Sequence, residues 1–339
     1  MRINGERKKV SDKFFINLKY ALRWHKPILI LRLLIRMIEL YVFKMTPLRY
    51  VDYAIGYRCN LNCEHCFAKG KRDPKRGRMP PWHWVKIVKE CMALGAVNFS
   101  FQGGEPLIYK DLPKYIRSAR PWANLISVTT NGALLDYKKC RELRKWGVDI
   151  ITLSVDPYRK NANWHSIIET AKKAGLNVTI GTVITNDDVN KLRNKKHPDL
   201  KGLIHYARMY KTILMLIFAV PMGGFEGKEV LLTEENADYV RDLAKKVPYV
   251  RTDFQANYLH EGCGAGKEIL FINPYGDVLP CPYINIAYGN LRYQSIKKIR
   301  RKMLCDPKFR KYCPRCIAGE GKGLWGEFSL QVQQDLSAE

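Results

Sequence analysis

Three cysteines lie close together at Cys59, Cys63 and Cys66, directly after the apolar run 51–56. Their C-x3-C-x2-C spacing indicates a metal site, because a disulfide framework would need an even number of cysteines at larger separations. A structural zinc site needs a fourth ligand. His65 is the nearest candidate, but the short arc between Cys63 and Cys66 would turn its ring away from a metal that those two share. A 4Fe–4S cluster normally takes four thiolates, so three leave one iron open to an outside ligand.

A glycine loop, Gly103-Gly104-Glu105-Pro106, follows the next apolar run, 97–102. Two glycines let the backbone approach a ligand closely, and the carboxylate supplies a fixed acceptor. Two further apolar runs, 125–130 and 150–155, bring polar residues to their ends, among them Asn131 and Ser154. Taken singly, each of these residues also fits a turn or a cap.

Apolar runs alternate with helical patterns between residues 50 and 225. The runs predict buried parallel strands at 51–56, 97–102, 125–130, 150–155, 178–184 and 213–220. The helical patterns lie at 82–94, 112–120, 137–146, 164–174 and 200–210. This order predicts an α/β fold, a partial (β/α)6 TIM-type barrel. Sites in such barrels form on the loops after the strands, where the cysteine triplet and the glycine loop stand.

The two motifs together resemble those of the radical S-adenosylmethionine (SAM) enzymes. The triplet with His65 before its last cysteine is similar to the family's cluster signature, and Gly103-Gly104-Glu105 is similar to its GGE motif. The resemblance implies that Cys59, Cys63 and Cys66 are catalytic and hold a 4Fe–4S cluster with SAM on its open iron. It also implies a SAM-binding role for His65, Gly103, Gly104, Glu105, Asn131 and Ser154.

Five further cysteines follow after residue 225, and four of them, Cys263, Cys281, Cys313 and Cys316, form the candidate ligand set. The spacing from Gly276 to Cys281 resembles the G-x4-C of the SPASM and twitch extensions of radical SAM proteins, which hold auxiliary clusters. This resemblance implies a second 4Fe–4S cluster on the four thiolates, with Cys305 in reserve. A complete SPASM domain has further cysteines, which are missing after Cys316. Zinc on the same four cysteines is the rival interpretation.

Residues 1–49 differ from the rest in charge. The first 50 residues hold 12 Lys and Arg against 3 Asp and Glu, a net charge of +9. Residues 12–26 predict an amphipathic helix with an apolar face of Phe14, Phe15, Leu18, Ala21 and Leu22. After Pro27, the run 28–43 aligns Arg32, Arg36 and Glu39 in one stripe, too many charges for a membrane span. We therefore expect this segment to lie on an anionic membrane surface, with a cap on the barrel as the alternative.

The sequence thus predicts three parts: a basic amphipathic segment (1–49), a radical SAM barrel (50–225) and an α+β auxiliary-cluster subdomain (226–339). The expected activity is reductive cleavage of SAM to a 5′-deoxyadenosyl radical, which abstracts a hydrogen atom from a lipid or isoprenoid-type substrate. A ribosomally made peptide is the alternative substrate. A non-catalytic iron–sulfur or zinc protein is the alternative class.

Net charge and the N-terminal sequence indicate which partners and which cellular location to expect. The formal net charge of +26 favours an anionic partner, but no nucleic-acid-binding motif is present, so nucleic acid is not expected. A radical SAM enzyme needs an electron donor such as a ferredoxin or flavodoxin. Without a signal-peptide pattern, thiolate clusters indicate a reducing cytoplasm, with the protein peripheral on the inner face of the membrane.

Overall fold

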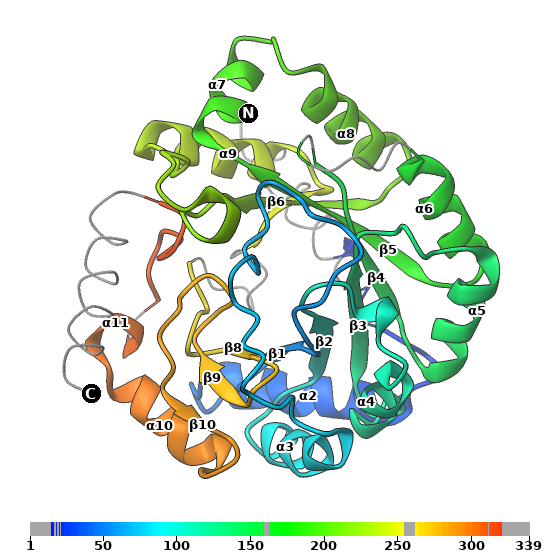
Figure 1. Cartoon of the computed structure of the whole chain (residues 1–339), viewed down its shortest axis with the longest axis vertical. Helices are drawn as coiled ribbons and strands as arrows, with labels where there is room; N and C mark the ends of the chain where they lie inside the picture. Colours follow the sequence, from blue (N-terminus) through cyan, green and yellow to red (C-terminus); the bar gives the residue numbers. More distant parts are fainter. Residues whose placement is uncertain are drawn as a thin grey trace.

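The computed structural model describes residues 22–156, 158, 163–253, 262–310 and 312–320, together with 15, 16, 18 and 20. A ten-stranded sheet curves into an open barrel with helices on its outer side (Figure 1). The strand order is β10-β9-β8-β1-β2-β3-β4-β5-β6-β7. All neighbours from β8 through β7 pair in parallel, and β8, β9 and β10 pair antiparallel. This confirms the predicted partial TIM-type barrel.

The strands are short and follow the predicted apolar runs closely. Their bounds are β1 Tyr50–Ala54, β2 Asn98–Gln102, β3 Leu125–Thr130, β4 Ile150–Ser154, β5 Asn177–Ile184, β6 Ile213–Phe218, β7 Val250–Thr252, β8 Ile269–Ile272, β9 Asp277–Leu279 and β10 Gly289–Asn290.

Helices connect the strands and cover the outside of the sheet. Their bounds are α2 Pro27–Tyr41, α3 Pro81–Ala93, α4 Leu112–Ser118, α5 Tyr137–Trp146, α6 Trp164–Lys173, α7 Asn186–Arg193, α8 Pro198–Met209, α9 Glu234–Lys246, α10 Ile296–Cys305 and α11 Pro307–Arg310, with 3-10 turns η1 Pro106–Ile108 and η2 Gly223–Phe225. Local chemistry sets their ends: Asp136 caps α5 by accepting from the Lys139 N–H, and Gly147 ends it with φ 99°.

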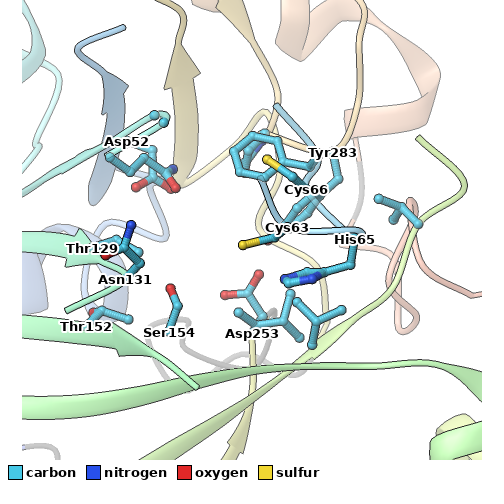
Figure 2. A pocket seen from close by; sticks show the side chains of 18 of the residues that line it. Asp52, Cys63, His65, Cys66, Thr129, Asn131, Thr152, Ser154, Asp253 and Tyr283 are labelled. Atoms are coloured by element: carbon cyan, nitrogen blue, oxygen red, sulfur yellow. The ribbon is translucent and has the colours of Figure 1, made fainter. Parts of the chain in front are cut away.

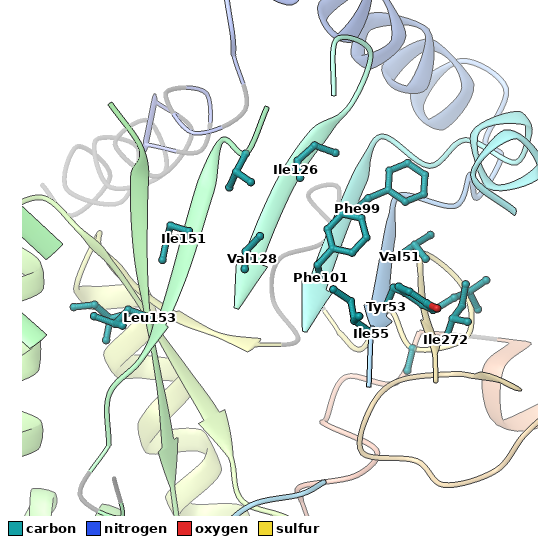
Figure 3. Packing of buried hydrophobic residues seen from close by; sticks show 14 of the residues in the cluster. Val51, Tyr53, Ile55, Phe99, Phe101, Ile126, Val128, Ile151, Leu153 and Ile272 are labelled. Atoms are coloured by element: carbon teal, nitrogen blue, oxygen red, sulfur yellow. The ribbon is translucent and has the colours of Figure 1, made fainter. Parts of the chain in front are cut away.

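Side chains on the strands alternate between an apolar outer face and a polar inner face. The outer row of register partners, buried against the helices in Figure 3, includes Val51, Phe99 and Ile126. The next row points into the barrel and includes Asp52, Ser100 and Ser127. The sequence analysis expected strands buried in apolar surroundings on both faces. The inner face is polar instead, because the barrel encloses a cavity.

The parallel sheet extends past residue 225, where the predicted alternation stops. After α9, the short strand β7 pairs with β6 from Leu214↔Val250 to Leu216↔Thr252. At the other edge, β8 pairs with β1 from Tyr50↔Ile269 to Tyr53↔Ile272. The β8–β9 hairpin, which the sequence predicts within the auxiliary subdomain, is therefore an extension of the barrel sheet.

The base of the barrel, at the N-terminal ends of the strands, is covered by α2 and the residues before it. Lys26 donates to the Asp149 carboxylate and to the Asn124 carbonyl. Arg32 donates to the Ala123 carbonyl at 3.0 Å. These acceptors directly precede β3 and β4. Because Lys26 and Asp149 are both buried, removing either partner would leave an uncompensated charge. The cap considered as an alternative for this segment is therefore present.

The described residues of the preceding segment also turn toward the barrel. Ile16 is buried, and the Tyr20 hydroxyl donates to the Val178 carbonyl at 2.9 Å. Phe15 is 63% exposed, whereas Leu18 and Leu22 on the same predicted face are half-buried, so that face contacts the protein only in part. Phe14 and Ala21, also placed on that face, lie outside the described residues. Within the described parts of the chain, every helix is too short or too polar to cross a bilayer.

Candidate functional site

A cavity of about 170 Å³ lies inside the barrel at the C-terminal ends of the parallel strands (Figure 2). Its walls come from the loops after β1 and β2, the ends of β3, β4, β6 and β7, and the loop after β9. The predicted site residues that line it are Cys59, Cys63, His65, Cys66, Gly103, Gly104, Asn131 and Ser154. The structure thus brings the two sequence motifs to one cavity. Of the residues predicted around SAM, Glu105 alone is not part of its wall.

Backbone contacts join the cysteine loop to the glycine loop. The Gly104 N–H donates to the Gly56 carbonyl at 2.8 Å, and the Glu105 N–H donates to the Arg58 carbonyl at 2.9 Å. A Cβ atom at Gly104 would lie 2.0 Å from the Arg58 carbonyl oxygen. The glycines are therefore needed for the two loops to pack together, in addition to the ligand approach expected from the sequence.

A second pair of glycines supports the cysteine loop from the other side, which the sequence analysis missed. The Gly224 N–H, in η2, donates to the Cys66 carbonyl at 3.0 Å. A Cβ atom at Gly224 would lie only 1.6 Å from the Glu64 carbonyl oxygen. The Lys228 ammonium pairs with the Glu64 carboxylate at 2.6 Å. The adjacent glycines after β6 were the available sequence signal, but on sequence alone they indicated only the end of the barrel.

Replacing Gly224 by Ala is expected to displace the cysteine loop, because backbone rather than a flexible side chain occupies the space of the new methyl group. Such overpacking costs about 1–3 kcal/mol, and we expect the iron bound at the first cysteine site to fall roughly by half. Iron analysis and the thermal midpoint measure the effect. Gly202→Ala, in open space on α8, is the matched control. Equal iron content in the two variants would contradict this account of the loop.

His65 is held at the cavity wall by its neighbours. Its Nε2 lies 3.3 Å from the Asp156 carboxylate, and both side chains are buried. The ring packs against Tyr158 and Phe225, with centroid distances of 5.4 and 6.2 Å. These contacts fix the ring beside Cys63, as Figure 2 shows. Its predicted contact with the cofactor stays a prediction.

Glu105 is buried and directs its carboxylate at neighbouring protein groups. Its Oε1 accepts from the Thr130 hydroxyl at 2.8 Å and from the Leu107 N–H at 3.1 Å, and its Oε2 accepts from the Asn131 N–H at 2.8 Å. The Asn131 side chain in turn donates to Asn60 Oδ1 at 2.9 Å. Glu105 therefore joins the ends of β2 and β3 and orients Asn131 toward the cysteine loop. The contact with the SAM amino group remains a prediction.

Two acidic side chains in the cavity were not predicted from the sequence. Asp52 projects from β1, and Asp253 follows β7 directly. Burial raises the pKa of Asp52 to about 7, with the charge of Asp253 adding to the shift. Burial likewise raises the pKa of Asp253 to about 6. Asp52 lies inside an apolar run and Asp253 beyond the expected end of the barrel, so neither belongs to a recognisable motif.

The raised pKa of Asp52 predicts a pH-dependent stability. Its pKa lies above the ordinary value of 3.8, so the folded protein retains a proton that the unfolded chain releases. Asp52 therefore costs little stability below pH 4 and progressively more as the pH rises to about 7. Asp52→Asn is expected to raise the thermal midpoint at pH 8 by roughly 2–5 °C and to change it little at pH 4. Asp199→Asn, on the surface of α8, is the control. A pH-independent difference would contradict the assignment.

The second group of cysteines comes together beside the barrel. Cys263 and Cys313 pair as an antiparallel bridge, with the Cys263 N–H donating to the Cys313 carbonyl at 2.7 Å. Burial raises the pKa of the Cys263 thiol to about 11. Burial, followed by the charges of Cys263 and Cys281, raises the pKa of the Cys316 thiol well above its usual range. Thiols whose pKa values are raised in this way need a bound metal or cluster to persist as thiolates.

The donor set at this second site fits an iron–sulfur cluster or zinc. Among the described residues, no three His, Cys, Asp or Glu side chains are arranged to hold a single metal ion. Assignment of the ligands therefore rests on the chemistry of the cysteines. Cys305, the reserve ligand, is exposed at the end of α10. Cys91 and Cys140 are buried within α3 and α5, as expected for inert thiols.

Lys71 lies between the two groups of cysteines. Burial lowers the pKa of Lys71 to about 8, and the charges of Cys281 and Cys66 oppose the shift. Nearby, the Arg76 guanidinium pairs with the Asp277 carboxylate on β9 at 2.9 Å. The basic residues after the cysteine loop therefore attach it to the β8–β9 hairpin, so the two cysteine sites are neighbours.

Comparison with protein families agrees with this arrangement. The model of the Radical SAM superfamily matches residues 53–195. The SPASM model, described as an iron-sulfur cluster-binding domain, matches residues 263–317. Together they cover both groups of cysteines, and they imply 4Fe–4S clusters and SAM as the cofactors.

Similar proteins include enzymes of several kinds. A probable GTP 3′,8-cyclase of Methanococcus aeolicus is 31% identical over 259 residues, which cover 70% of this chain and 82% of that protein. An AdoMet-dependent heme synthase of Oleidesulfovibrio alaskensis is 24% identical, with coverage of 77% and 76%.

Solved structures show the same fold. Streptococcus suis SuiB bound to the precursor peptide SuiA superimposes with a TM-score of 0.57 at 18% identity, over 80% of this chain and 68% of SuiB. anSMEcpe with bound AdoMet and the Cp18Cys peptide gives a TM-score of 0.56 at 18% identity, with coverage of 86% and 98%. From its fold, its two family models and its relatives, this chain belongs to the radical SAM superfamily and is an enzyme of the group that carries a SPASM domain.

Proposed function

We propose that Cys59, Cys63 and Cys66 hold the SAM-binding cluster and that a substrate reacts in the cavity beneath them. The observation that carries this proposal is that the three cysteines line one cavity with Gly103 and Gly104. When bound, the cluster supplies an electron for cleavage of SAM to methionine and a 5′-deoxyadenosyl radical, which abstracts a hydrogen atom from the substrate.

The chain's own residues hold and orient the reactants. Gly104 allows the glycine loop to approach the cysteine loop, and Glu105 orients Asn131, which lies near Ser154 at the ends of the neighbouring strands β3 and β4. We propose that Asn131 and Ser154 contact the ribose and carboxylate of SAM. His65, fixed by Asp156, supports the loop beside them. The cap of α2 on the barrel base shields the reactants from water on that side.

We propose that the reacting part of the substrate is polar and carries amino or hydroxyl groups. Asp52 and Asp253 supply acceptors inside the cavity, and Tyr283 adds a hydroxyl. Further hydroxyls come from Thr152 and Ser154 on β4. A peptide side chain or another water-soluble polar group would form hydrogen bonds with these residues, whereas an isoprenoid chain would form none. The apolar lipid expected from the sequence is therefore the less favoured substrate.

We further propose that Cys263, Cys281, Cys313 and Cys316 hold a second 4Fe–4S cluster. A ferredoxin- or flavodoxin-type donor would supply the electrons, and an acidic protein of this kind suits a chain with a net charge of +26. We also propose a peripheral location on an anionic membrane surface. The net charge of the first 50 residues and the exposed apolar side chains of α2 support this location.

The reaction can be tested with anaerobically reconstituted protein, dithionite and SAM. We expect 5′-deoxyadenosine and methionine in equal amounts, measured by mass spectrometry. Cluster-loaded protein that forms neither product would instead support a non-catalytic iron–sulfur protein.

The substrate class can be tested with the same assay. Extracts of source cells grown on deuterated medium would be separated into water-soluble and lipid fractions and added to the enzyme. Deuterium in 5′-deoxyadenosine identifies the fraction that donates the hydrogen atom. Transfer from the water-soluble fraction is expected, whereas transfer only from the lipid fraction would contradict the polar assignment.

A further inference from the structure

The helix α2 turns its charged residues inward. Arg32 donates to backbone carbonyls at the base of the barrel, including that of Ala123. One turn on, Arg36 pairs with Glu39 at 2.7 Å, and both side chains are largely buried. Leu29 and Leu40 are buried on the same side. Because the polar stripe is used for the cap, the opposite side of α2 is left apolar.

That opposite side is exposed. We define the α2 outer face as the exposed apolar side chains Ile28, Leu31, Leu34, Ile35, Ile38 and Tyr41. Their spacing of three and four places them along one stripe. Leu31 and Leu34 are each 57% exposed, and Trp24, just before the helix, is 82% exposed. Val42, Phe43 and Met45 continue the exposed apolar surface beyond the helix end. A contiguous surface of this kind marks an interaction site.

Cations gather at the same end of the barrel. Each barrel helix runs back from the cavity end, so its last turn lies beside the start of the next strand. The last turns carry Arg117 in α4, Arg144 and Lys145 in α5, Lys172 and Lys173 in α6, Arg208 in α8, and Lys245 and Lys246 in α9. Cations at helix C-termini also suit the helix dipole. The topology nevertheless brings them to the face that α2 covers.

The cavity opens at the other end. Its wall comes from the C-terminal ends of the strands, for example Thr130 and Ser154, whereas α2 contacts residues that precede strands, such as Ala123 and Asn124. In Figure 1 the helix lies behind the strands and is drawn fainter than the loops in front of them. Any surface that binds the α2 outer face therefore lies opposite the opening of the cavity.

We propose that the α2 outer face, with the basic helix ends on the same side, docks the protein on an anionic lipid bilayer and directs the cavity toward the aqueous phase. This inference rests on the proposed membrane location and adds its orientation. An anionic bilayer matches both features, because it accepts apolar side chains and neutralises the surrounding cations. A second copy of the chain is disfavoured, since it would bring two basic surfaces together.

Vesicle flotation with the full-length, cluster-loaded protein tests the proposal. Vesicles of phosphatidylcholine with phosphatidylglycerol are expected to bind the protein, more weakly as salt rises, and vesicles of phosphatidylcholine alone are expected to bind it poorly. The triple variant Leu31→Ser, Leu34→Ser, Ile38→Ser should weaken binding by at least about tenfold. The matched control Trp82→Ser, Val85→Ser removes exposed apolar side chains from α3 near the cavity end and should bind normally.

A second pair of variants tests the charges. Arg117→Gln, Lys145→Gln, Lys173→Gln removes exposed cations from three helix ends on the α2 side. Lys110→Gln, Lys114→Gln, Lys138→Gln removes the same number near the opposite helix ends. Each cation near the surface contributes about a fivefold change in affinity, so only the first variant should lose most of its binding to anionic vesicles.

The outcomes distinguish the proposed membrane location from the proposed orientation on the membrane. Wild-type protein that ignores anionic vesicles would remove both the membrane location and its orientation. Vesicle binding that is equal in the α2 and α3 variants would overturn the orientation alone. Unchanged vesicle binding together with loss of a dimer in light scattering would assign the α2 outer face to self-association and would also overturn it. Unchanged 5′-deoxyadenosine formation by the α2 variant shows that the barrel has folded.

Discussion

Replacing Cys59, Cys63 and Cys66 together by Ala is expected to abolish the formation of 5′-deoxyadenosine, at least about a thousandfold below the wild-type rate. The three thiols line the same cavity as the glycine loop, and no other described cysteine lines it. Without them SAM has no iron to bind. The second site should keep its cluster, so iron content should fall by about half rather than to zero.

The control for this triple variant is Cys305→Ala, which removes an exposed thiol outside both groups. It should leave both iron content and SAM cleavage unchanged. Circular dichroism on the triple variant separates loss of chemistry from loss of fold. If the triple variant still forms 5′-deoxyadenosine at the wild-type rate, the catalytic assignment of these cysteines is wrong.

Replacing Cys313 and Cys316 together by Ala is expected to remove the second cluster and lower bound iron from about eight atoms to about four. Both thiols belong to the group in which Cys263 and Cys313 are bridged and Cys316 interacts electrostatically with Cys263 and Cys281. Two ligands cannot hold a four-iron cluster that four ligands stabilise. Iron and zinc analysis of the same samples measures the result.

The second prediction also distinguishes the metals. Iron that falls by half, with zinc absent before and after, supports a 4Fe–4S cluster. About four irons and one zinc in the unmodified protein, with zinc lost in the variant, would establish the zinc interpretation. Tyr283 lies on the cavity wall two residues after Cys281, a ligand of the second cluster in our proposal. Loss of that cluster should therefore displace Tyr283, and we expect it to weaken substrate binding more than SAM binding.

Much of the barrel could be predicted because its signals are local. The strand 125–130 and the helix 137–146 have the predicted bounds, since an apolar run and a helical period define each one. The strand β7 has only three residues, Val250–Thr252, too few to show a pattern. The helix α7 was missed although Thr185 and Asp188 form a capping box at its start, because it is short and polar, with only Val189 and Leu192 as large apolar residues.

The candidate site divides in the same way. Cys59, Gly104 and Asn131 were found because each belongs to a compact motif after a strand. Asp253 lines the same cavity and Gly224 supports its cysteine loop. Both come from distant segments that only the closure of the barrel brings to the site. The polar inner face of the barrel could not be predicted either, because Asp52 is a single polar residue within an apolar run. Alternation along so short a strand is visible only once the facing strands are known.

For the N-terminal segment, amphipathicity was predicted correctly, but not the direction of its two faces. The stripe of Arg32, Arg36 and Glu39 was expected on a helix at a membrane surface, but Arg32 binds backbone carbonyls at the barrel base and Arg36 pairs with Glu39. Sequence alone cannot choose between solvent and a protein acceptor for a cation. Backbone carbonyls that precede the strands, such as that of Ala123, accept hydrogen bonds from these cations. This is why the charged side of α2 faces the barrel.

The pairing of β1 with β8 sets an order for the assembly of the enzyme during synthesis. Arg49 and Glu268, which flank this pairing, are 219 positions apart in the chain. At about 5–20 residues per second, the ribosome needs about 10–40 s to make that interval. Throughout this time β1 keeps one edge unpaired, and the cysteine loop that follows it lacks the hairpin to which Arg76 attaches. We therefore expect iron and sulfide to be inserted at the cysteine loop only after the β8–β9 hairpin has emerged from the ribosome.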